Sequence, residues 1–212
     1  MSKKVVIIDF QLGNLFSVHQ ACLNFRIDAV ISSDKSIVLN ADAIILPGVG
    51  AFGDAMNSLI KLDLVKPIQD FVSGGKPFMG VCLGLQLLFT ESEEFGSHKG
   101  LNIIKGTVKK FPAFDSDHLK IRVPQIAWNQ ISQKKTWSRT PLKGIREEEY
   151  MYFVHSYYVC PENTDDTLAE TTYGGLQYCS AVSKNNIFAT QFHPEKSAAE
   201  GLKIYKNWLE MI

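Results

Sequence analysis

The sequence has no long hydrophobic run and no excess of charge of either sign. No apolar stretch approaches the roughly 18 residues that cross a bilayer, and an acidic residue, Asp9, comes too early for a secretory signal. Lys and Arg together number 22, as do Asp and Glu, so no long-range field attracts nucleic acid. We therefore expect no membrane or nucleic-acid partner, and we expect the protein to be cytosolic.

The cysteines are few and scattered, and no two of them form a CxxC pair. This spacing argues against a zinc site and against a disulfide framework. We expect no metal ion and no cofactor, so a cysteine with a function should act as a thiol. A length of 212 residues, without repeats or linkers, predicts one domain over residues 1–212. The four cysteines are Cys22, Cys82, Cys160 and Cys179.

The first half of the chain alternates strand and helix patterns. Continuous β-branched runs predict strands buried on both faces, and apolar residues three and four apart predict helices between them. Such units favour a doubly wound parallel sheet, whose ligands bind beyond the carboxyl ends of its strands, near loops 10–14, 47–53 and 80–84. Strands are expected at Val5–Phe10, Ala29–Ser32, Ala43–Leu46 and Phe78–Val81, and helices at 15–25, through Met56 and Leu59, from near Pro67, and at Leu83–Phe89.

In the second half the helical period disappears and short strand patterns replace it, which predicts an added antiparallel portion. Apolar residues from Gly201 to Ile212 restore a helical stripe, so a last helix should pack back on the sheet. The predicted fold is therefore α/β with a mostly parallel central sheet. The expected strands are Ile103–Val108, Ile121–Ile126, Met151–Val159, Leu168–Thr172, Tyr178–Val182 and Ile187–Phe192.

Cys82 stands between a predicted buried strand and the helix that follows, with Gly80 and Gly84 two residues to either side. This pattern is typical of a nucleophile elbow, a tight turn that projects its side chain from the sheet edge. At a helix N-terminus the free N–H groups and the helix dipole favour the thiolate. We interpret Cys82 as a nucleophile and the other three cysteines as core residues.

A cysteine nucleophile needs a base, and His193 is the best candidate. It ends an apolar strand before Pro194, and Glu195 lies two residues on, where a carboxylate can orient the imidazole. His155 is the rival base, but its place inside a long apolar strand favours a structural role. The remaining histidines, His19, His98 and His118, fit a solvated surface.

An elbow cysteine with a distant His-Pro-Glu resembles the class I glutamine amidotransferases, and among them the glutaminase subunits of imidazole glycerol phosphate synthase. The resemblance covers nearly the whole chain. It is carried by Asp9 with Gly13-Asn14-Leu15 and Ser17, Leu46-Pro47-Gly48-Val49-Gly50-Ala51-Phe52-Gly53, Gly80-Val81-Cys82-Leu83-Gly84-Leu85-Gln86, Val123-Pro124 with Trp128-Asn129, Tyr152-Phe153-Val154-His155-Ser156-Tyr157, and Gln191 through Ser197.

The resemblance implies that Cys82 attacks the side-chain amide of L-glutamine, that His193 moves the protons and that Glu195 orients the histidine. It places an oxyanion hole between the Leu83 amide and the segment holding Val49 and Gly50. We expect this loop to withhold an oxyanion donor until a partner binds. The positions matching glutamine-binding residues are Gln86, Ser156 and Tyr157.

The resemblance also implies that ammonia passes to a (βα)₈-barrel cyclase, the other half of a heterodimer, to make imidazole glycerol phosphate and AICAR in histidine biosynthesis. Residues matching those near that contact are Asn14, Trp128, Tyr152 and Lys196. One departure is Gln125-Ile126-Ala127, where the family usually has His-Met-Gly. It leaves open a paralogous glutaminase for amidination of a surface-polysaccharide sugar. A non-catalytic scaffold and a stand-alone cysteine hydrolase are the further alternatives.

Overall fold

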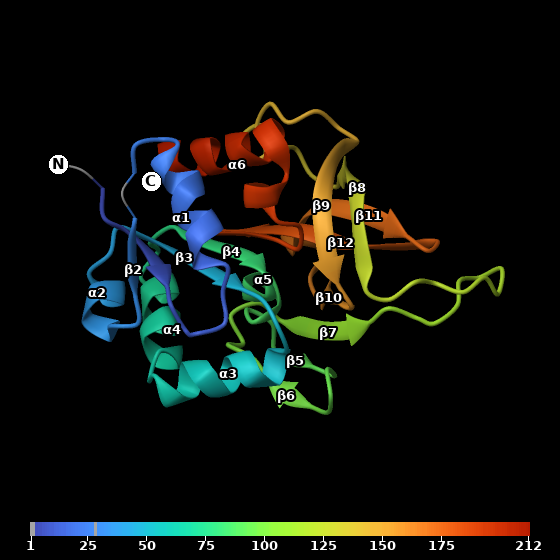
Figure 1. Ribbon diagram of the computed structural model, residues 1–212, viewed down its shortest axis with the longest axis horizontal. Coiled ribbons are helices and arrows are strands. Elements are labelled where there is room, and N and C mark those ends of the chain that lie inside the picture. Colours follow the sequence, from blue (N-terminus) through green and yellow to red (C-terminus); the bar gives the residue numbers. More distant parts are fainter. Residues whose placement is uncertain (1–2, 28) are drawn as a thin grey trace.

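A sheet with five adjacent parallel strands forms the centre of the computed structural model, which describes residues 3–27 and 29–212 (Figure 1). The order β2-β1-β3-β4-β13 confirms the predicted doubly wound arrangement, and β13 enters it from far along the chain. The carboxyl ends of these strands therefore share one edge. The strands are β1 (Val5–Ile8), β2 (Val30–Ser32), β3 (Ala43–Gly48), β4 (Phe78–Cys82) and β13 (Ile187–Thr190).

Helices cover both faces of this sheet, which is why its strands are continuously apolar. In β1, Val5 and Ile7 pack into the core beneath α1 and α6, whereas Val6 and Ile8 pack into the core on the side of α3 and α4. No helix of the described residues is long and apolar enough to cross a bilayer. The α-helices are α1 (Leu15–Leu23), α2 (Lys35–Leu39), α3 (Phe52–Lys61), α4 (Val65–Ser73), α5 (Leu83–Gln86) and α6 (Ala198–Glu210), and short 3₁₀ turns are η1 (Thr164–Asp166) and η2 (Pro194–Lys196).

The second half of the chain extends the sheet with mostly antiparallel strands. The order continues from β13 through β12, β10, β7 and β5 to β6, while β11, β8 and β9 form a ribbon that branches from β12. The ribbon stands beside the parallel sheet and carries β9 past the ends of its strands (Figure 1). These strands are β5 (Glu91–Ser92), β6 (His98–Lys99), β7 (Gly106–Lys110), β8 (Gln125–Gln133), β9 (Glu149–His155), β10 (Tyr157–Pro161), β11 (Thr167–Tyr173) and β12 (Leu176–Lys184).

Several predicted boundaries were wrong. The expected helix Leu83–Phe89 ends at Gln86, because the carbonyls of residues 87–89 accept backbone N–H groups from residues 101–104 instead. That pairing also explains why the expected strand Ile103–Val108 begins only at Gly106. The last strand was expected to be antiparallel, yet β13 is parallel to β4 and antiparallel only to β12.

Two more expectations failed in the ribbon. The run Met151–Val159 is two strands broken at Ser156, since β9 pairs with β8 while β10 pairs with β7 and β12. The strand expected at Ile121–Ile126 starts at Gln125, after Pro124, which has no N–H to give to a ladder. The short elements α2, β5 and β6 were not predicted.

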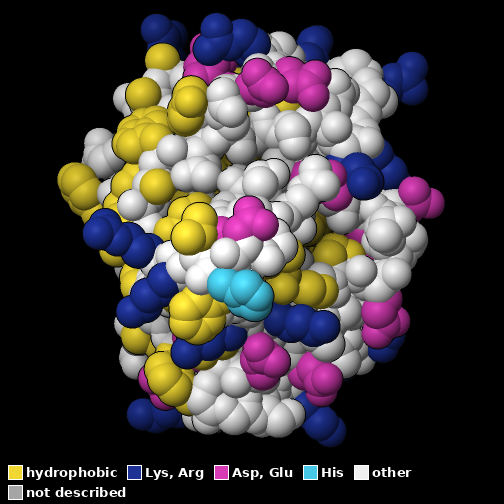
Figure 2. Space-filling view, turned by 90° about the vertical axis from the view of Figure 1, so that its right-hand side faces the viewer, with side chains coloured by type: hydrophobic (Ala, Val, Ile, Leu, Met, Phe, Trp, Pro, Cys, Tyr) yellow, Lys and Arg dark blue, Asp and Glu magenta, His cyan; other side chains and the backbone are white. Residues whose placement is uncertain are grey.

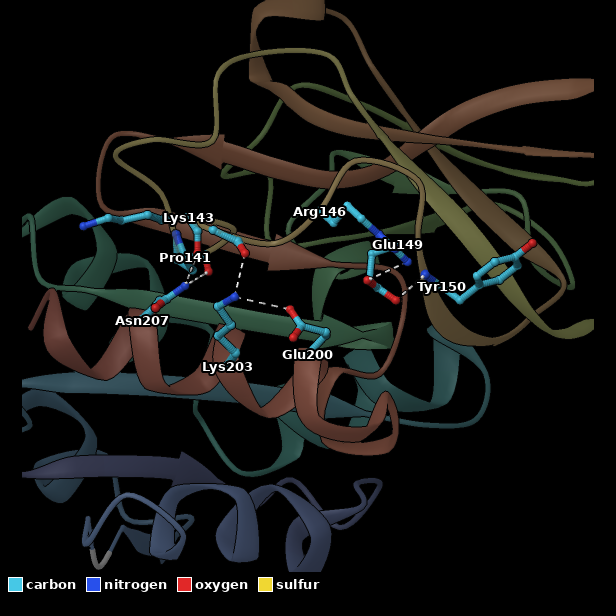
Figure 3. A network of polar contacts seen from close by, with 9 residues as sticks. Pro141, Lys143, Arg146, Glu149, Tyr150, Glu200, Lys203 and Asn207 are labelled. Carbon is cyan, nitrogen blue, oxygen red and sulfur yellow. Dashed lines mark hydrogen bonds and ion pairs between the residues drawn. The ribbon is translucent and has the colours of Figure 1, made fainter.

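The loop between β8 and β9 is fastened to α6 by polar contacts (Figure 3). Asn207 Nδ2 donates to the carbonyls of Pro141 and Lys143 at 2.9 and 2.7 Å, and Lys203 Nζ donates to Gly144 O at 2.6 Å. The start of β9 is held beside it by an Arg146–Glu149 ion pair of 3.5 Å. The ribbon is thus anchored to the helix that follows His193.

Candidate active site

Cys82 occupies a strained backbone turn where β4 meets α5. Its φ of 55° and ψ of −111° lie in a region that L residues other than glycine rarely adopt. The turn is possible because Gly84 packs directly on the neighbouring strand, where a Cβ would lie 1.8 Å from Leu46 O. The structure therefore has the predicted elbow, and its strain is concentrated at the cysteine.

His193 and Glu195 form a buried pair just beyond the end of β13. His193 Nδ1 lies 2.7 Å from Glu195 Oε1, and the two side chains are 2% and 1% exposed. Burial by itself lowers the pKa of His193, but the neighbouring Cys82 and Glu195 outweigh it and raise this pKa above its ordinary value. Nδ1 therefore donates to the carboxylate, and Cys82 lies close enough to interact with the same ring.

A cavity of about 290 Å³ opens over these residues. The segments that follow β3, β4 and β13 contribute to it, and the junction between β9 and β10 lines its other side. It is large enough for an amino-acid side chain, and both polar and apolar residues line it. Its walls are Val49, Gly50, Cys82, Leu83, Gln86, Glu94, Pro124, Val154, His155, Ser156, Tyr157 and His193.

The two sides of the predicted oxyanion hole differ in whether their amide N–H groups already have a backbone partner. Leu83 is the first residue of α5, whose N-terminal amides have no partner within the helix. The Val49 amide, in contrast, donates to Leu12 O at 3.1 Å and so is not offered to the cavity. Gly50 follows with a φ of 96°, a conformation that glycine adopts readily.

Among the predicted glutamine-binding residues, Gln86 is turned inward. Its Nε2 donates to Tyr157 O and to Gln191 Oε1, both at 3.0 Å, and Gln191 Nε2 in turn lies 3.8 Å from Cys82 Sγ. Gln86 thus joins α5 to β10 beneath the cavity. Ser156 and Tyr157 line the cavity at the strand break.

Glu94 is a cavity residue that the sequence analysis missed. It accepts the Phe52 N–H at 2.6 Å, and burial raises the pKa of its carboxyl. It belongs to an irregular loop after β5, in the acidic run Glu91 to Glu94, which has the pattern of a solvated surface. No periodicity distinguishes it, so only its placement reveals it.

His155, the rival base, is enclosed by other partners. Its Nδ1 lies 2.8 Å from Tyr157 O and its Nε2 lies 3.3 Å from the hydroxyl of Tyr178, which donates to Gln125 Oε1 at 2.9 Å. Burial lowers the pKa of His155 to about 4. It is therefore neutral near pH 7 and held in place, as a structural histidine should be.

The structure brings three of the four predicted contact residues together. Trp128 on β8 is opposite Tyr152 on β9, with ring centroids 6.0 Å apart, and Lys196 Nζ lies 6.0 Å from the Tyr152 ring. The fourth, Asn14, immediately precedes α1, which packs on η2. Figure 2 shows hydrophobic side chains gathered along the left of the molecular face it presents, with Lys and Arg among them.

The family profile described as Glutamine amidotransferase class-I matches residues 6–211. The chain belongs to this family. Among curated relatives, this amidotransferase is 47% identical to "Imidazole glycerol phosphate synthase subunit HisH" of Syntrophotalea carbinolica, over 98% of the chain and 100% of the relative. The protein of the same name from Geobacter sulfurreducens is 45% identical over 98% and 99%. The predicted resemblance is confirmed.

Solved structures of lower sequence identity share the fold of this amidotransferase. One described as a glutamine amidotransferase has a TM-score of 0.73 at 17% identity and covers 97% of both chains. The structure of PurLQS from Thermotoga maritima has a TM-score of 0.71 at 17% identity, covering 100% of this chain and 99% of the other. The amidotransferase fold is thus retained while most of the sequence differs.

Proposed function

We propose that this amidotransferase is the glutaminase subunit of an imidazole glycerol phosphate synthase. In this proposal it hydrolyses L-glutamine and delivers the ammonia to a (βα)₈-barrel cyclase partner, in the cytoplasm, for histidine biosynthesis. The observation that supports it most is the strained Cys82 elbow beside the His193–Glu195 pair at one cavity, in a chain that aligns almost end to end with HisH relatives.

The chemistry follows from these three side chains. Cys82 gives its thiol proton to His193, and Sγ attacks the side-chain carbonyl carbon of glutamine. His193 passes this proton to the departing nitrogen, and the C–N bond breaks to leave a glutamyl thioester and free ammonia. His193 then takes a proton from water, which attacks the thioester; the C–S bond breaks, glutamate is released and the proton returns to Cys82. Glu195 keeps the Nδ1 proton in place, so that Nε2 is the nitrogen that accepts and donates.

The cavity supplies groups for each part of the substrate. We assign the oxyanion to the amides of Leu83 and of the Val49–Gly50 segment, and substrate positioning to Gln86, Ser156 and Tyr157. The missed Glu94 presents a carboxylate to the same cavity, suited to the α-ammonium group of glutamine. None of these assignments requires a metal ion or a cofactor.

Partner control follows from the Val49 amide. As long as it is bonded to Leu12 O, the tetrahedral intermediate lacks one donor, so turnover without a partner should be slow. The proposed contact face consists of Trp128, Tyr152, Lys196 and Asn14. Binding of a partner there would favour a loop conformation in which the Val49 amide is released from Leu12 O. The departures at Gln125, Ile126 and Ala127 lie on the same strand and would adjust the choice of barrel.

Replacement of Cys82 by alanine tests the proposal. With the synthase cyclase and its substrate present, Cys82→Ala should lose glutamine-dependent synthesis by at least ~10³-fold while synthesis from added ammonium salt continues. Cys160→Ala is the matched control, since this cysteine lies outside the cavity, and it should keep both activities. Retained glutamine turnover in Cys82→Ala would refute the nucleophile.

The wild-type protein separates the alternatives. Glutamate release stimulated only by a polysaccharide-pathway barrel would identify the paralogue. Full turnover with no partner would contradict the gating and favour a stand-alone hydrolase. Absence of glutaminase activity with every partner would leave a scaffold. A glutamine-analogue electrophile should label Cys82 and spare Cys22, Cys160 and Cys179.

A further inference from the structure

A closed set of three hydrogen bonds joins the His193 backbone to β9 through Ser197. The His193 N–H donates to Tyr152 O at 3.0 Å, the Tyr152 N–H donates to Ser197 Oγ at 2.9 Å, and Ser197 Oγ donates to His193 O at 2.7 Å. Ser197 is 1% exposed. Its one hydroxyl therefore uses its proton on the base-bearing residue and a lone pair on the neighbouring strand.

The two structures that this hydroxyl connects are themselves fixed. Ser197 directly precedes α6, which the contacts of Lys203 and Asn207 hold to the loop after β8 (Figure 3). Gly201 packs so closely on this turn that a Cβ there would lie 2.1 Å from Pro194 O. The turn that holds His193 and Glu195 is thus packed between α6 and β9.

The hydrogen bonds to Ser197 matter because β13 ends before the base. The ladder stops at Thr190, so the parallel sheet does not fix the backbone at position 193. Pro194 follows and cannot donate a bond. The links to β9 act together with the Lys196 N–H, which donates to His193 O at 3.0 Å, and with the Glu195 carboxylate on Nδ1 to set the distance of the imidazole from Cys82. Catalytic groups misplaced by about 1 Å can lose about 10²-fold in rate.

We propose that Ser197 is a positioning residue, whose hydroxyl holds His193 against β9 and so sets the imidazole at the distance from Cys82 that catalysis requires. This inference rests on the proposed role of His193 as the base. It assigns Ser197 no contact with substrate. Loss of the hydroxyl should therefore reduce kcat and leave the KM for glutamine nearly unchanged.

Ser197→Ala tests the proposal, with Ser180→Ala as a matched control. Ser180 is equally buried, at 0% exposed, but its hydroxyl has no hydrogen-bond partner among the described residues. With the cyclase partner bound, Ser197→Ala should lower kcat for glutamine by about 10- to 100-fold. Ser180→Ala should stay within about twofold of the wild type.

Alkylation of Cys82 by iodoacetamide supplies a readout that requires neither partner nor turnover. In the wild type, the imidazole of His193 lies beside Cys82 and can accept its proton, so at one fixed pH the Cys82 peptide, followed by mass spectrometry, should be alkylated faster than the peptides of the other cysteines. In Ser197→Ala the alkylation rate of Cys82 should fall toward the rates of the other cysteines. In Ser180→Ala the rate should not change.

The two measurements keep the outcomes distinct. If Ser197→Ala matches Ser180→Ala in both kcat and the alkylation rate of Cys82, the positioning role is wrong. A loss confined to KM or to thermal stability would likewise overturn it. If Ser197→Ala does not fold, Ser197→Cys fills the space with a weaker donor and should lower kcat and the alkylation rate in the same direction. Failure of the proposed function would instead appear as an inactive wild type.

Discussion

The surroundings of His193 and of His155 show how one fold gives two buried histidines opposite properties. Both rings are buried beside the same cavity, and burial disfavours the charged form of each. His193 faces a carboxylate and a thiol, and its pKa is raised. His155 faces a carbonyl and a phenol, and its pKa is lowered to about 4. The charge of the neighbours, and not the depth of burial, assigns the roles.

The contrast extends to the ribbon strand β8, which reaches both histidines. Trp128 points toward the side of His193, since its ring packs on Tyr152, whose ring lies 6.4 Å from that of His193. Gln125 points into the core and is joined through Tyr178 to His155. One face of β8 therefore lies on the side of His193, and the other face contacts the residues that hold His155.

Substitution of each histidine by asparagine gives the largest expected difference. His193→Asn should lower kcat for glutamine by about 10³-fold or more, because His193 is the base that lies beside Cys82 in the cavity. His155→Asn should mainly raise KM or lower stability, because its hydrogen bonds hold the wall of the cavity. Steady-state kinetics with the partner, with circular dichroism as the control for folding, measure both. A larger kcat loss at position 155 would reverse the roles.

The two histidines should also affect the pH dependence of the unfolding free energy differently, and this effect should be smaller. The folded pKa of His155 lies below its unfolded value near 6.5, so the unfolded state takes up a proton first as pH falls. Between about pH 6.5 and 4, this costs up to about 3 kcal/mol of unfolding free energy. His193, with a raised pKa, contributes stability that is complete below about pH 6.5 and is lost progressively as the pH rises from there toward its folded pKa.

Urea titrations across this range test the sign. The unfolding free energy of the wild type should fall from pH 6.5 to 4, and His155→Asn should flatten that fall. His193→Asn should keep the acid fall and, in further titrations above pH 6.5, remove the fall that the wild type shows there. An unchanged acid slope in His155→Asn would show that other groups, not this imidazole, account for it.

The sequence alone predicted the proposed reacting groups Cys82 and His193 because each stands where a strong local pattern ends. The buried run before Cys82 and the Gln191-Phe192-His193-Pro194 string marked two neighbouring strand ends, and parallel topology then placed them at one edge. The partners of His155 and the carboxylate of Glu94 come from the ribbon and from an irregular loop. Their approach depends on long-range pairing that carries no local period, so the sequence did not reveal it.

The same limit explains the boundary errors. Ser156 interrupts an apolar alternation that reads as one strand, because the chain leaves β8 for β7 there. Helix α5 ends at Gln86 because the carbonyls of residues 87–89 accept N–H groups from residues 101–104 in a later loop. In both places contacts with residues far along the chain end an element, although the local sequence favours its continuation.

The smallest expected effect concerns partner binding through the outer face of β8. Trp128 is 48% exposed and large, the type of side chain that dominates interfaces when a partner buries it. Trp128→Ala should cost about 2 kcal/mol of association with the cyclase, a rise of about 30-fold in Kd. Met211→Ala, which removes another exposed apolar side chain at the far end of α6, should change Kd by less than about twofold. Because the Trp128 ring packs on Tyr152, which in turn lies beside His193, its loss should weaken binding much more than it lowers kcat at saturating partner. Titration of each variant with the cyclase, followed by kcat at saturation, measures both quantities. Equal effects of the two alanine variants on Kd would remove Trp128 from the contact face and leave the His193 side of the cavity without its link to the partner.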